Sequence, residues 1–400
     1  MTVISRQSPR IFLLNADKLL QIKESRTSGD RLFDSAINQL SQIADKALKD
    51  GPFRVGERPQ PDALLSPEGD KHDYFSLAPY WWPNPNTPDG LPYIRKDGER
   101  NPDTDKIPDA KNLNGMVNSV ARLTLAYYFT GKEVYAKHAA DLLRIWFLAE
   151  NTRMNPNMAY AQVIMGMNDG YGKRHGIIEA HGFIYVVDSI GLLAESKDWN
   201  LKDQYEIQQW FSQYLEWLLT SDNGKDEAEA SNNHATWYAA QAAAIALFLD
   251  KKEIVTRCLQ RIQALIADQI KPDGQQPLET ERRTQPWYYS TFNLNGLFHV
   301  AALAERVGID LWNYRTADDR SIRKALDYLV PFVLNPSKWP YKKDISKNIG
   351  KDKNITVLLR QASVRYRDQQ YLEIIQKSYQ LDELDKLNML IGWCVREAWD

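Results

Sequence analysis

The chain has 400 residues, of which 43% are hydrophobic and 26% are charged, and its formal net charge is −2. This is an ordinary globular composition with enough apolar residues for a large core. A charge so close to zero provides no overall field to attract nucleic acid or an anionic membrane, so we expect neither partner. The 12 Trp and 20 Tyr suit either a Trp-rich helical core or a sugar-binding cleft.

Targeting and metal-binding motifs are not apparent in the sequence. The N-terminal segment MTVISRQSPRIFLLNADKL has no apolar stretch of the signal-peptide type, and no run approaches the ~18 apolar residues of a membrane-spanning helix. We therefore expect no signal peptide and no membrane span, and the cellular location stays open. The sequence contains no Cys-x-x-Cys or His-x-x-His pair, so we expect no metal or other cofactor.

Helical periodicity dominates the chain. Residues 31–49 carry an apolar stripe at three- and four-residue spacing, whereas residues 51–110 are rich in Pro, Gly and aromatic side chains. Helical patterns then follow one another to the C-terminus, and strand-like alternation is nearly absent. We expect these helices near 112–130, 133–149, 177–195, 203–220, 234–250, 252–269, 289–307, 321–333, 355–366, 368–378 and 384–399.

Roughly a dozen consecutive helices joined by segments with Gly, Pro, Asn and Asp predict an all-α fold. Antiparallel helical hairpins suggest an (α/α) toroid or incomplete barrel, with long aromatic loops as lids and a single domain over residues 1–400. A helical solenoid would produce a similar pattern.

Three connecting segments differ from ordinary loops. The segment around YWWPNP is too aromatic for a disordered linker, so we expect either an ordered lid or apolar packing for an N-terminal arm. A second unusual segment is 153–176. The third, 335–353, has six Lys against two Asp, and is either the best local attractor of an anion or a solvated surface loop. Candidate substrate contacts in the three segments are Tyr80, Trp81, Trp82, Tyr160, Gln162, Lys338 and Trp339.

The motif SNNHATW opens an Ala-rich helix, so one of Ser231, Asn232 and Asn233 is expected to be the N-cap. For a single Asn or His, a structural role would be the better interpretation. The backbone N–H groups of a helix N-terminus also favour an anion such as a carboxylate. The presence of His234 and Trp237 beside the Asn pair therefore points to a binding site as well as to a cap.

A second motif begins with Arg282 and Arg283 and continues through Trp287, Tyr288 and Tyr289 into a helix. Adjacent arginines are common on protein surfaces. A guanidinium beside a phenol, however, stabilises the phenolate and lowers a pKa that otherwise lies near ~10. A phenol with a lowered pKa can exchange a proton near neutral pH.

Together these motifs resemble the alginate lyase family, whose members are helical-toroid polysaccharide lyases. The resemblance rests on Asn232, Asn233, His234 and Trp237, and on the seven-residue interval between Arg282 and Tyr289. It also rests on DYFSLAPYWWPNPNTPDGLPYIRKDG and MNPNMAYAQ…GMNDG, which look like segments of the family's broader branch of bacterial and fungal members, including glucuronan-type lyases. It is strongest over residues 70–310.

The resemblance implies a lyase that cleaves a β-1,4-linked polyuronate by syn β-elimination and leaves a 4,5-unsaturated uronate end. Asn233 and His234 would neutralise the substrate carboxylate, and Arg282 would assist them and lower the pKa of Tyr289. Tyr289 would take the C5 proton and return a proton to O4. The ligand would be an anionic uronic-acid polysaccharide or oligosaccharide, and a monomer is expected. Further expected substrate contacts are Asn232, Trp237, Arg283 and Tyr288.

The stereochemistry of the sugar limits the expected substrate. In mannuronate and glucuronate the C5 proton and O4 lie on the same face, so one Tyr can serve as base and acid. Guluronate presents them on opposite faces and would need a second group, for which His234 is the candidate. The narrower alginate-specific branch of the family has a Lys-Arg-Tyr cluster in its lid, and this sequence offers only Lys71, Tyr74 and the YWW aromatics in its place. The choice between mannuronan and glucuronan therefore stays open.

Two other classes of function compete with the lyase. A glycoside hydrolase would need two carboxylates flanking the scissile bond, for which the sequence offers Asp169, Glu179, Asp188 and Glu279. A catalytically inactive carbohydrate-binding protein would keep the toroid without turnover. The family is mostly exported, in contrast to the expected lack of a signal peptide.

Overall fold

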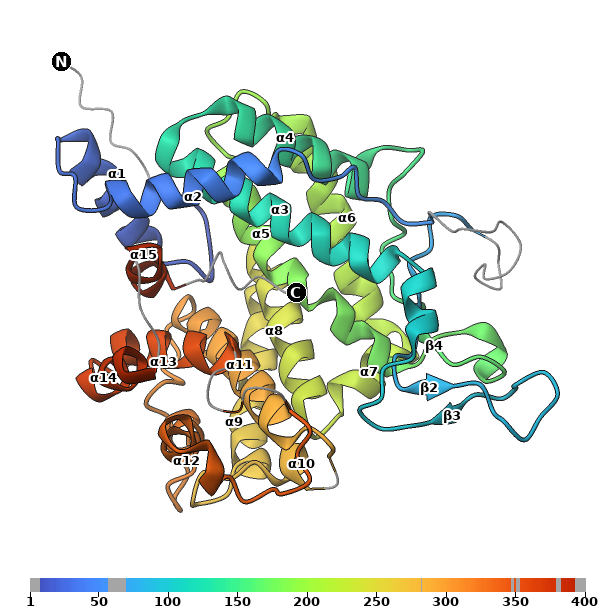
Figure 1. The fold of residues 1–400 in the computed structure, drawn as a ribbon. Coiled ribbons are helices and arrows are strands. Elements are labelled where there is room, and N and C mark those ends of the chain that lie inside the picture. The colour runs from blue at the N-terminus through green and yellow to red at the C-terminus, as the bar shows by residue number, and fades with distance from the viewer. Residues whose placement is uncertain are drawn as a thin grey trace.

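The computed structural model describes residues 8–56, 70–281, 283–346, 349, 353–378 and 383–392, and these are predominantly helical (Figure 1). The first helices are α1 (Ala16–Thr27), α2 (Asp34–Ala47), α3 (Asp109–Thr130), α4 (Glu133–Leu143) and α5 (Phe183–Leu192). The middle of the chain forms α6 (Leu201–Thr220), α7 (Asp222–Ala228), α8 (Asn233–Phe248), α9 (Lys252–Gln269) and α10 (Pro277–Thr280). The last are α11 (Pro286–Glu305), α12 (Ile322–Leu334), α13 (Lys353–Arg365), α14 (Gln369–Ser378) and α15 (Glu383–Ile391).

The helices form a ring. Helix α3 contacts α5, α5 contacts α8, and α8 contacts α11, which in turn contacts α13. The contacts continue from α13 to α15 and from α15 to α2, which returns to α3. Figure 1 shows the red α15 beside the blue α1 and α2, so the last described helix packs against the first two. The predicted all-α toroid is therefore confirmed.

The composition of the helices decides which of them lie inside the ring. Almost every residue of α8 and α11 is buried, and all of α5 except one glycine is buried. Helices that are apolar on all sides belong inside a fold, whereas an apolar stripe on one side suits the outer layer. Helix α9 is of the second kind and packs against α8 from outside.

In the described part of the chain, four short strands lie outside the ring, at one end. Strand β1 (Phe75–Leu77) pairs in parallel with β4 (Tyr160–Val163), and β2 (Trp81–Trp82) pairs antiparallel with β3 (Ile94–Arg95). The Pro-rich segment therefore contains ordered structure, although its strands are too short to produce a visible alternation. The remaining short turns are η1 (Pro102–Lys106), η2 (Arg144–Leu148, a π turn), η3 (Asn168–Gly170), η4 (Arg174–Gly182) and η5 (Pro336–Lys338).

Most expected helices are present close to their predicted bounds, with two instructive differences. The range 177–195 begins as the 3₁₀ turn η4 and becomes α-helical only at Phe183. Helix α1 was not predicted, because its amphipathic pattern is weak and only Ala16, Leu19 and Ile22 of it are buried. Within the described residues, no helix is both long and apolar enough to span a membrane.

Candidate active site

A cavity of about 590 Å³ opens at the end of the ring where the strands lie. The N-terminal ends of three inner elements, η4, α8 and α11, contribute to its lining, and the β2–β3 hairpin contributes Trp81 and Arg95. Helix N-termini carry partial positive charge, so this arrangement favours an anion. The lining residues are Ala78, Pro79, Tyr80, Trp81, Arg95, Gln162, Ile164, Lys173, Arg174, His175, Ile178, Asn232, Asn233, His234, Glu281, Arg283, Tyr288, Tyr289 and Phe292.

Asn233 is held by a buried carboxylate. Its backbone N–H donates to Oε1 of Glu279 at 2.6 Å and its Nδ2 donates to Oε2 at 2.7 Å. Desolvation raises the pKa of Glu279, and the guanidinium of Arg283, 3.8 Å away, works against that rise. Because a carboxylate only accepts hydrogen bonds, the Nδ2 group of Asn233 faces Glu279.

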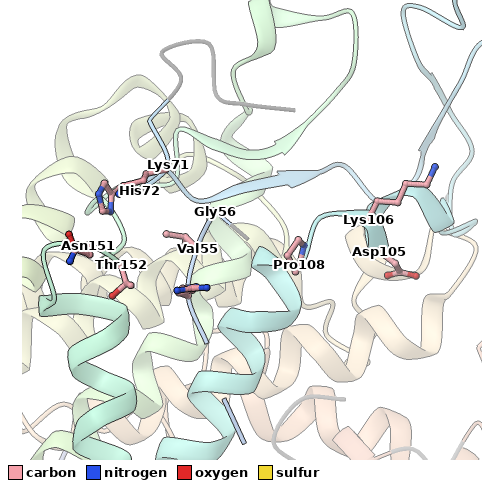
Figure 2. Close-up of a pocket in the computed structure, with 10 residues that line it drawn as sticks. Val55, Gly56, Lys71, His72, Asp105, Lys106, Pro108, Asn151 and Thr152 are labelled. Carbon is pink, nitrogen blue, oxygen red and sulfur yellow. The ribbon is translucent and has the colours of Figure 1, made fainter. Parts of the chain in front are cut away.

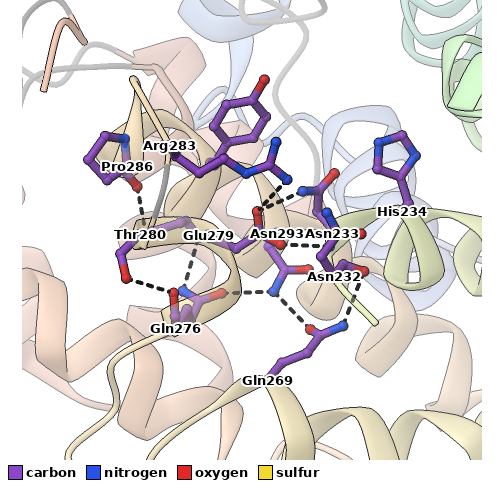
Figure 3. Close-up of polar contacts among 12 residues, drawn as sticks. Asn232, Asn233, His234, Gln269, Gln276, Glu279, Thr280, Arg283, Pro286 and Asn293 are labelled. Atoms are coloured by element: carbon purple, nitrogen blue, oxygen red, sulfur yellow. Dashed lines mark hydrogen bonds and ion pairs between the residues drawn. The ribbon is translucent and has the colours of Figure 1, made fainter. Parts of the chain in front are cut away.

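A buried amide network supports this pair from behind (Figure 3). Nδ2 of Asn293 donates to Gln269 at 2.9 Å and to Gln276 at 2.8 Å, and Gln269 donates to the backbone carbonyl of Asn232 at 3.2 Å. Asn232 occupies the N-cap position of α8, yet its side chain caps no backbone N–H. The end of α8 is therefore fixed by side chains from α9, α10 and α11.

His234 forms a second carboxylate pair. Its Nδ1 lies 2.5 Å from Oε1 of Glu227, and Nη1 of Arg174 donates to Oε2 of the same carboxylate at 2.8 Å. The ring of His175 packs edge-on against the ring of His234 with centroids 5.3 Å apart. Desolvation, followed by the charges of His234 and Arg174, lowers the pKa of His175 to about 4, so His175 is neutral at pH 7.

Tyr289 lies in the first turn of α11 beside two polar neighbours. Its hydroxyl donates to the hydroxyl of Tyr80 at 3.4 Å, and the guanidinium of Arg283 lies 4.4 Å from its ring centroid. Burial and then the contact with Tyr80 raise the pKa of Tyr289 well above its ordinary value, and Arg283 offsets only part of that rise. Among the described residues these contacts leave Tyr289 a neutral phenol at pH 7, and the lowering of its pKa by Arg282 stays a prediction. The residue expected to cause the lowering, Arg282, lies outside the described residues.

The cavity has an excess of positive side chains. Arg95, Lys173, Arg174 and Arg283 line it, whereas Glu281 is the one carboxylate among its described lining residues. These positive side chains come from the hairpin, from η4 and its flank, and from the segment before α11. The described residues of 335–353 do not line the cavity, and residues 347, 348 and 350–352 lie outside the described part of the chain. Lys338 is exposed and does not line the cavity.

Most of the predicted site residues are brought together, although they come from distant parts of the chain. Tyr80 and Trp81 approach from the hairpin, and Gln162 approaches from β4 with a positive φ of 53°. A non-glycine residue rarely adopts this backbone conformation, which often marks a functional position. The other predicted residues on the cavity wall are Asn232, Asn233, His234, Arg283, Tyr288 and Tyr289.

Four aromatic residues predicted as substrate contacts do not line the cavity. Trp237 is completely buried and packs against His181 and Phe292, so it belongs to the core of the ring. The other three differ in their surroundings. Tyr160 is buried and stacks on Tyr171. Trp339 is buried, and its indole N–H donates to Asp344. The indole N–H of Trp82 donates to the backbone carbonyl of Glu99, and the ammonium of Lys96 lies over the Trp82 ring. For Tyr160, Trp237 and Trp339 the prediction is wrong because burial leaves no face for a sugar.

Several residues that shape the site are not among those predicted from the sequence. Lys173, Arg174 and His175 stand within the segment 153–176, and their adjacency was the signal that could have marked them. Glu227 had no local signal, because only the fold brings it to His234. Nothing about Glu279 taken alone distinguished a partner of Asn233 from a catalytic acid.

A second cavity of about 770 Å³ lies by the N-terminal end of α3 (Figure 2). Lys71, considered as a stand-in for a lid residue, lines this cavity and not the first one. Tyr74 is also absent from the first cavity, because it is buried and donates to Glu179 at 2.8 Å. None of the residues predicted as catalytic or as substrate contacts lines the second cavity.

Comparisons with known proteins show which family this chain is related to. The sequence model of alginate lyases matches residues 60–339, which is more than half of the chain. The chain belongs to the alginate lyase family. An alginate lyase structure from Bacteroides ovatus is 37% identical, with a TM-score of 0.88 over 96% of this chain and 99% of that one.

More distant members of the alginate lyase family match less of the sequence. The alginate lyase of Pseudomonas syringae pv. tomato is 25% identical over 138 residues, and that of Cobetia marina is 24% identical over 136 residues. Each match spans 34% of this chain and 35% of the relative, so about a third of these relatives' length is covered. Alginate lyase A1-III, complexed with tetrasaccharide, is 17% identical over 96% of each chain with a TM-score of 0.63, which shows the fold alone.

Proposed function

We propose that this member of the alginate lyase family is a polysaccharide lyase that cleaves a β-1,4-linked polyuronate by β-elimination. The observation that carries the proposal is the meeting of Asn233, His234 and Tyr289 on one positively charged cavity wall. A uronate unit brings a carboxylate that needs neutralising, a C5 proton that must leave, and an O4 that must be protonated. The cavity offers groups suited to each of these tasks.

Charge neutralisation is the first task. Removing the C5 proton places a second negative charge on the carboxylate, and donors aimed at that carboxylate stabilise it most in a water-poor site. Asn233 and His234 stand at the N-terminus of α8, where the backbone dipoles also favour negative charge. Glu279 and Glu227 hold the two side chains, so little reorganisation is needed when the substrate enters.

Proton transfer is the second task. As a phenolate, Tyr289 takes the C5 proton, the C5–H electrons form the C4–C5 double bond, and the C4–O4 bond breaks. The phenol then gives a proton to O4, so the phenolate is regenerated and no net proton is consumed. Because burial and Tyr80 raise the pKa of Tyr289, its proton must be lost before the first turnover.

The expected polymer follows from the use of a single phenol. Taking a proton from C5 and giving one to O4 from the same atom requires both groups on one face of the sugar, as in mannuronate and glucuronate. Mannuronan and glucuronan are therefore the proposed substrates, and polyguluronate is expected to react poorly. Alginate lyase A1-III, which shares the fold, was solved complexed with a tetrasaccharide, and this chain is proposed to bind oligosaccharides in the cavity lined by Asn233, His234 and Tyr289.

The arrangement of carboxylates argues against a glycoside hydrolase. Glu279 is engaged by Asn233, and Asp188 is buried and accepts backbone N–H groups from residues 12–14. Glu179 accepts from Tyr74 and Ser76, and neither it nor Asp169 lines the cavity. The described lining therefore lacks the pair of carboxylates that a hydrolase places about 5–10 Å apart.

The test offers the protein mannuronan, polyguluronate and glucuronan separately and follows the ultraviolet absorbance of the unsaturated uronate. We expect absorbance to rise on mannuronan or glucuronan and to stay near the background on polyguluronate. Tyr289→Phe is the control, with an expected loss of about 10²- to 10⁴-fold in rate. Binding of all three polymers without any product would support the inactive carbohydrate-binding protein instead.

A further inference from the structure

Glu227 lies outside the cavity lining and yet connects two residues that line it. It belongs to the short helix α7, which contacts both α8 and η4, and its side chain is only 1% exposed. One oxygen contacts Nδ1 of His234 at 2.5 Å, and the other accepts from Arg174 at 2.8 Å. A buried carboxylate with a partner at each oxygen has a fixed orientation.

The two contacts of Glu227 determine where the proton of His234 lies. A carboxylate accepts and an arginine donates, so the ion pair with Arg174 leaves the other oxygen of Glu227 as an acceptor. Nδ1 of His234 must then carry a hydrogen, whatever the charge of the ring. Among the described residues Nε2 has no hydrogen-bond partner, so it is the nitrogen available to a ligand in the cavity.

We propose that Glu227, oriented by Arg174, is a positioning residue that keeps the proton on Nδ1 of His234 and presents Nε2 to the substrate. The imidazolium form of the ring offers Nε2–H as a donor to the uronate carboxylate, and the neutral form offers a lone pair. The buried pair of Glu227 and Arg174 excludes the alternative neutral tautomer of His234, in which Nε2 carries the proton and Nδ1 the lone pair. The catalytic consequence rests on the proposed lyase function, whereas the tautomer does not.

The decisive variant is Glu227→Gln. Arg174 can only donate, so the amide oxygen of the new side chain turns to Arg174 and its NH₂ group turns to Nδ1 of His234. An NH₂ group needs an acceptor, so Nδ1 loses its hydrogen and the proton moves to Nε2. One substitution of similar volume is thus expected to invert the tautomer.

The primary measurement is nitrogen NMR of protein labelled with ¹⁵N-histidine, with the His234 signals assigned by their loss in His234→Ala. We expect Nδ1 to be protonated in the unsubstituted protein and unprotonated in Glu227→Gln. In the double variant Arg174→Met, Glu227→Gln, the amide oxygen is free to turn back to His234, and Nδ1 should be protonated again. This reversal depends on the proposed role of Arg174 and would not follow from loosened packing.

The kinetic measurement compares the same variants on the preferred polymer. Where a wrong histidine tautomer disables a catalytic triad, kcat falls by about 10⁴-fold, so we expect Glu227→Gln to lower kcat by at least about 10²-fold. Glu227→Asp keeps the carboxylate on a shorter side chain and should restore part of kcat and all of the Nδ1 protonation. Glu229→Gln is the matched control, because Glu229 is exposed and pairs with Arg261 away from the cavity.

The tautomer of His234 and its catalytic role would be contradicted by different results. Nδ1 that stays protonated in folded Glu227→Gln would overturn the proposal, whether or not the protein is a lyase. An inverted tautomer with unchanged kcat would overturn the catalytic role of the pair. If Glu227→Gln does not fold, Glu227→Asp decides, because an unprotonated Nδ1 in that variant would contradict the proposal. Absence of lyase activity in the unsubstituted protein would leave the NMR test intact and would count against the proposed function alone.

Discussion

The guanidinium of Arg283 lies over the ring of Tyr289, 4.4 Å from its centroid, and one of its nitrogens is 3.8 Å from the carboxylate of Glu279. Arg283 is thus shared between the phenol and the carboxylate that holds Asn233. Its charge lowers the pKa of Tyr289, while burial and Tyr80 raise it, and the net direction is upward. The phenolate is therefore the minor form of Tyr289 at neutral pH.

This balance predicts an alkaline pH dependence. If the phenolate is the base, its fraction increases about tenfold per pH unit below the pKa, so kcat/KM should rise with pH until the protein unfolds. The measurement is kcat/KM on the preferred polymer across the neutral to alkaline range, with stability checked by circular dichroism. A rate that falls with rising pH, while the protein remains folded, would mean that Tyr289 acts only as an acid and that another group removes the C5 proton.

The positive lining of the cavity predicts a salt-dependent KM. Lys173 lines the cavity, and Lys173→Ala should raise KM for the polyuronate by about tenfold at low salt, because a charged contact is lost. Added salt should reduce the difference by screening. Lys338→Ala is the control, since Lys338 is exposed and outside the cavity, and it should leave KM unchanged. Equal effects of the two substitutions would contradict the placement of the anion-binding cluster.

The two adjacent tryptophans of β2 offer a matched pair. Trp81 lines the cavity, whereas Trp82 does not and instead donates to the backbone of Glu99. Trp81→Ala should raise KM by about two- to tenfold, which corresponds to a lost aromatic contact. Trp82→Ala should leave KM within about twofold. The comparison of KM values for the two variants checks which aromatic faces the sugar, and the reverse order would contradict it.

Substitution of Asp188 is expected to lower the stability of the protein without lowering kcat. The Asp188 oxygens accept the backbone N–H groups of Phe12, Leu13 and Leu14 at 2.6–2.9 Å, which attaches the N-terminal segment to α5. Asp188→Asn would place an NH₂ group against a backbone donor, so we expect a loss of about 1–3 kcal/mol in the free energy of unfolding. Urea unfolding measures it, with the exposed Asp268→Asn as the control. A large loss of kcat in folded Asp188→Asn would revive the hydrolase interpretation.

Much of the fold could be predicted from the sequence because helices carry their own pattern. The Ala-rich run of α8 and the apolar spacing of α9 are local features, and their observed bounds lie within a few residues of the expected ones. The closure of the ring is not local, because it depends on α15 meeting α2. The closed ring was therefore indicated by the resemblance to the alginate lyase family and not by helical periodicity.

Site residues could be predicted from the sequence where a reactive residue type stands within a motif. They could not be predicted where only the fold determines which way a side chain points or what surrounds it. Tyr289 and His234 stand out by type and neighbours, and the structure places both on one cavity wall. Trp237 belongs to the same motif as His234, but its position on α8 directs it into the core. The raised pKa of Tyr289 depends on burial and on Tyr80, more than two hundred residues away in the sequence, so no local pattern could predict it.

If each cut in the polymer is an elimination, one reaction creates two countable products, a new reducing end and a new double bond. New reducing ends are titrated chemically while new double bonds are followed by ultraviolet absorbance, on mannuronan and on glucuronan. We expect equal numbers of double bonds and reducing ends throughout the reaction, and the near disappearance of both in Tyr289→Phe. Reducing ends that accumulate without double bonds would contradict this expectation, because they would show hydrolysis of the glycosidic bond.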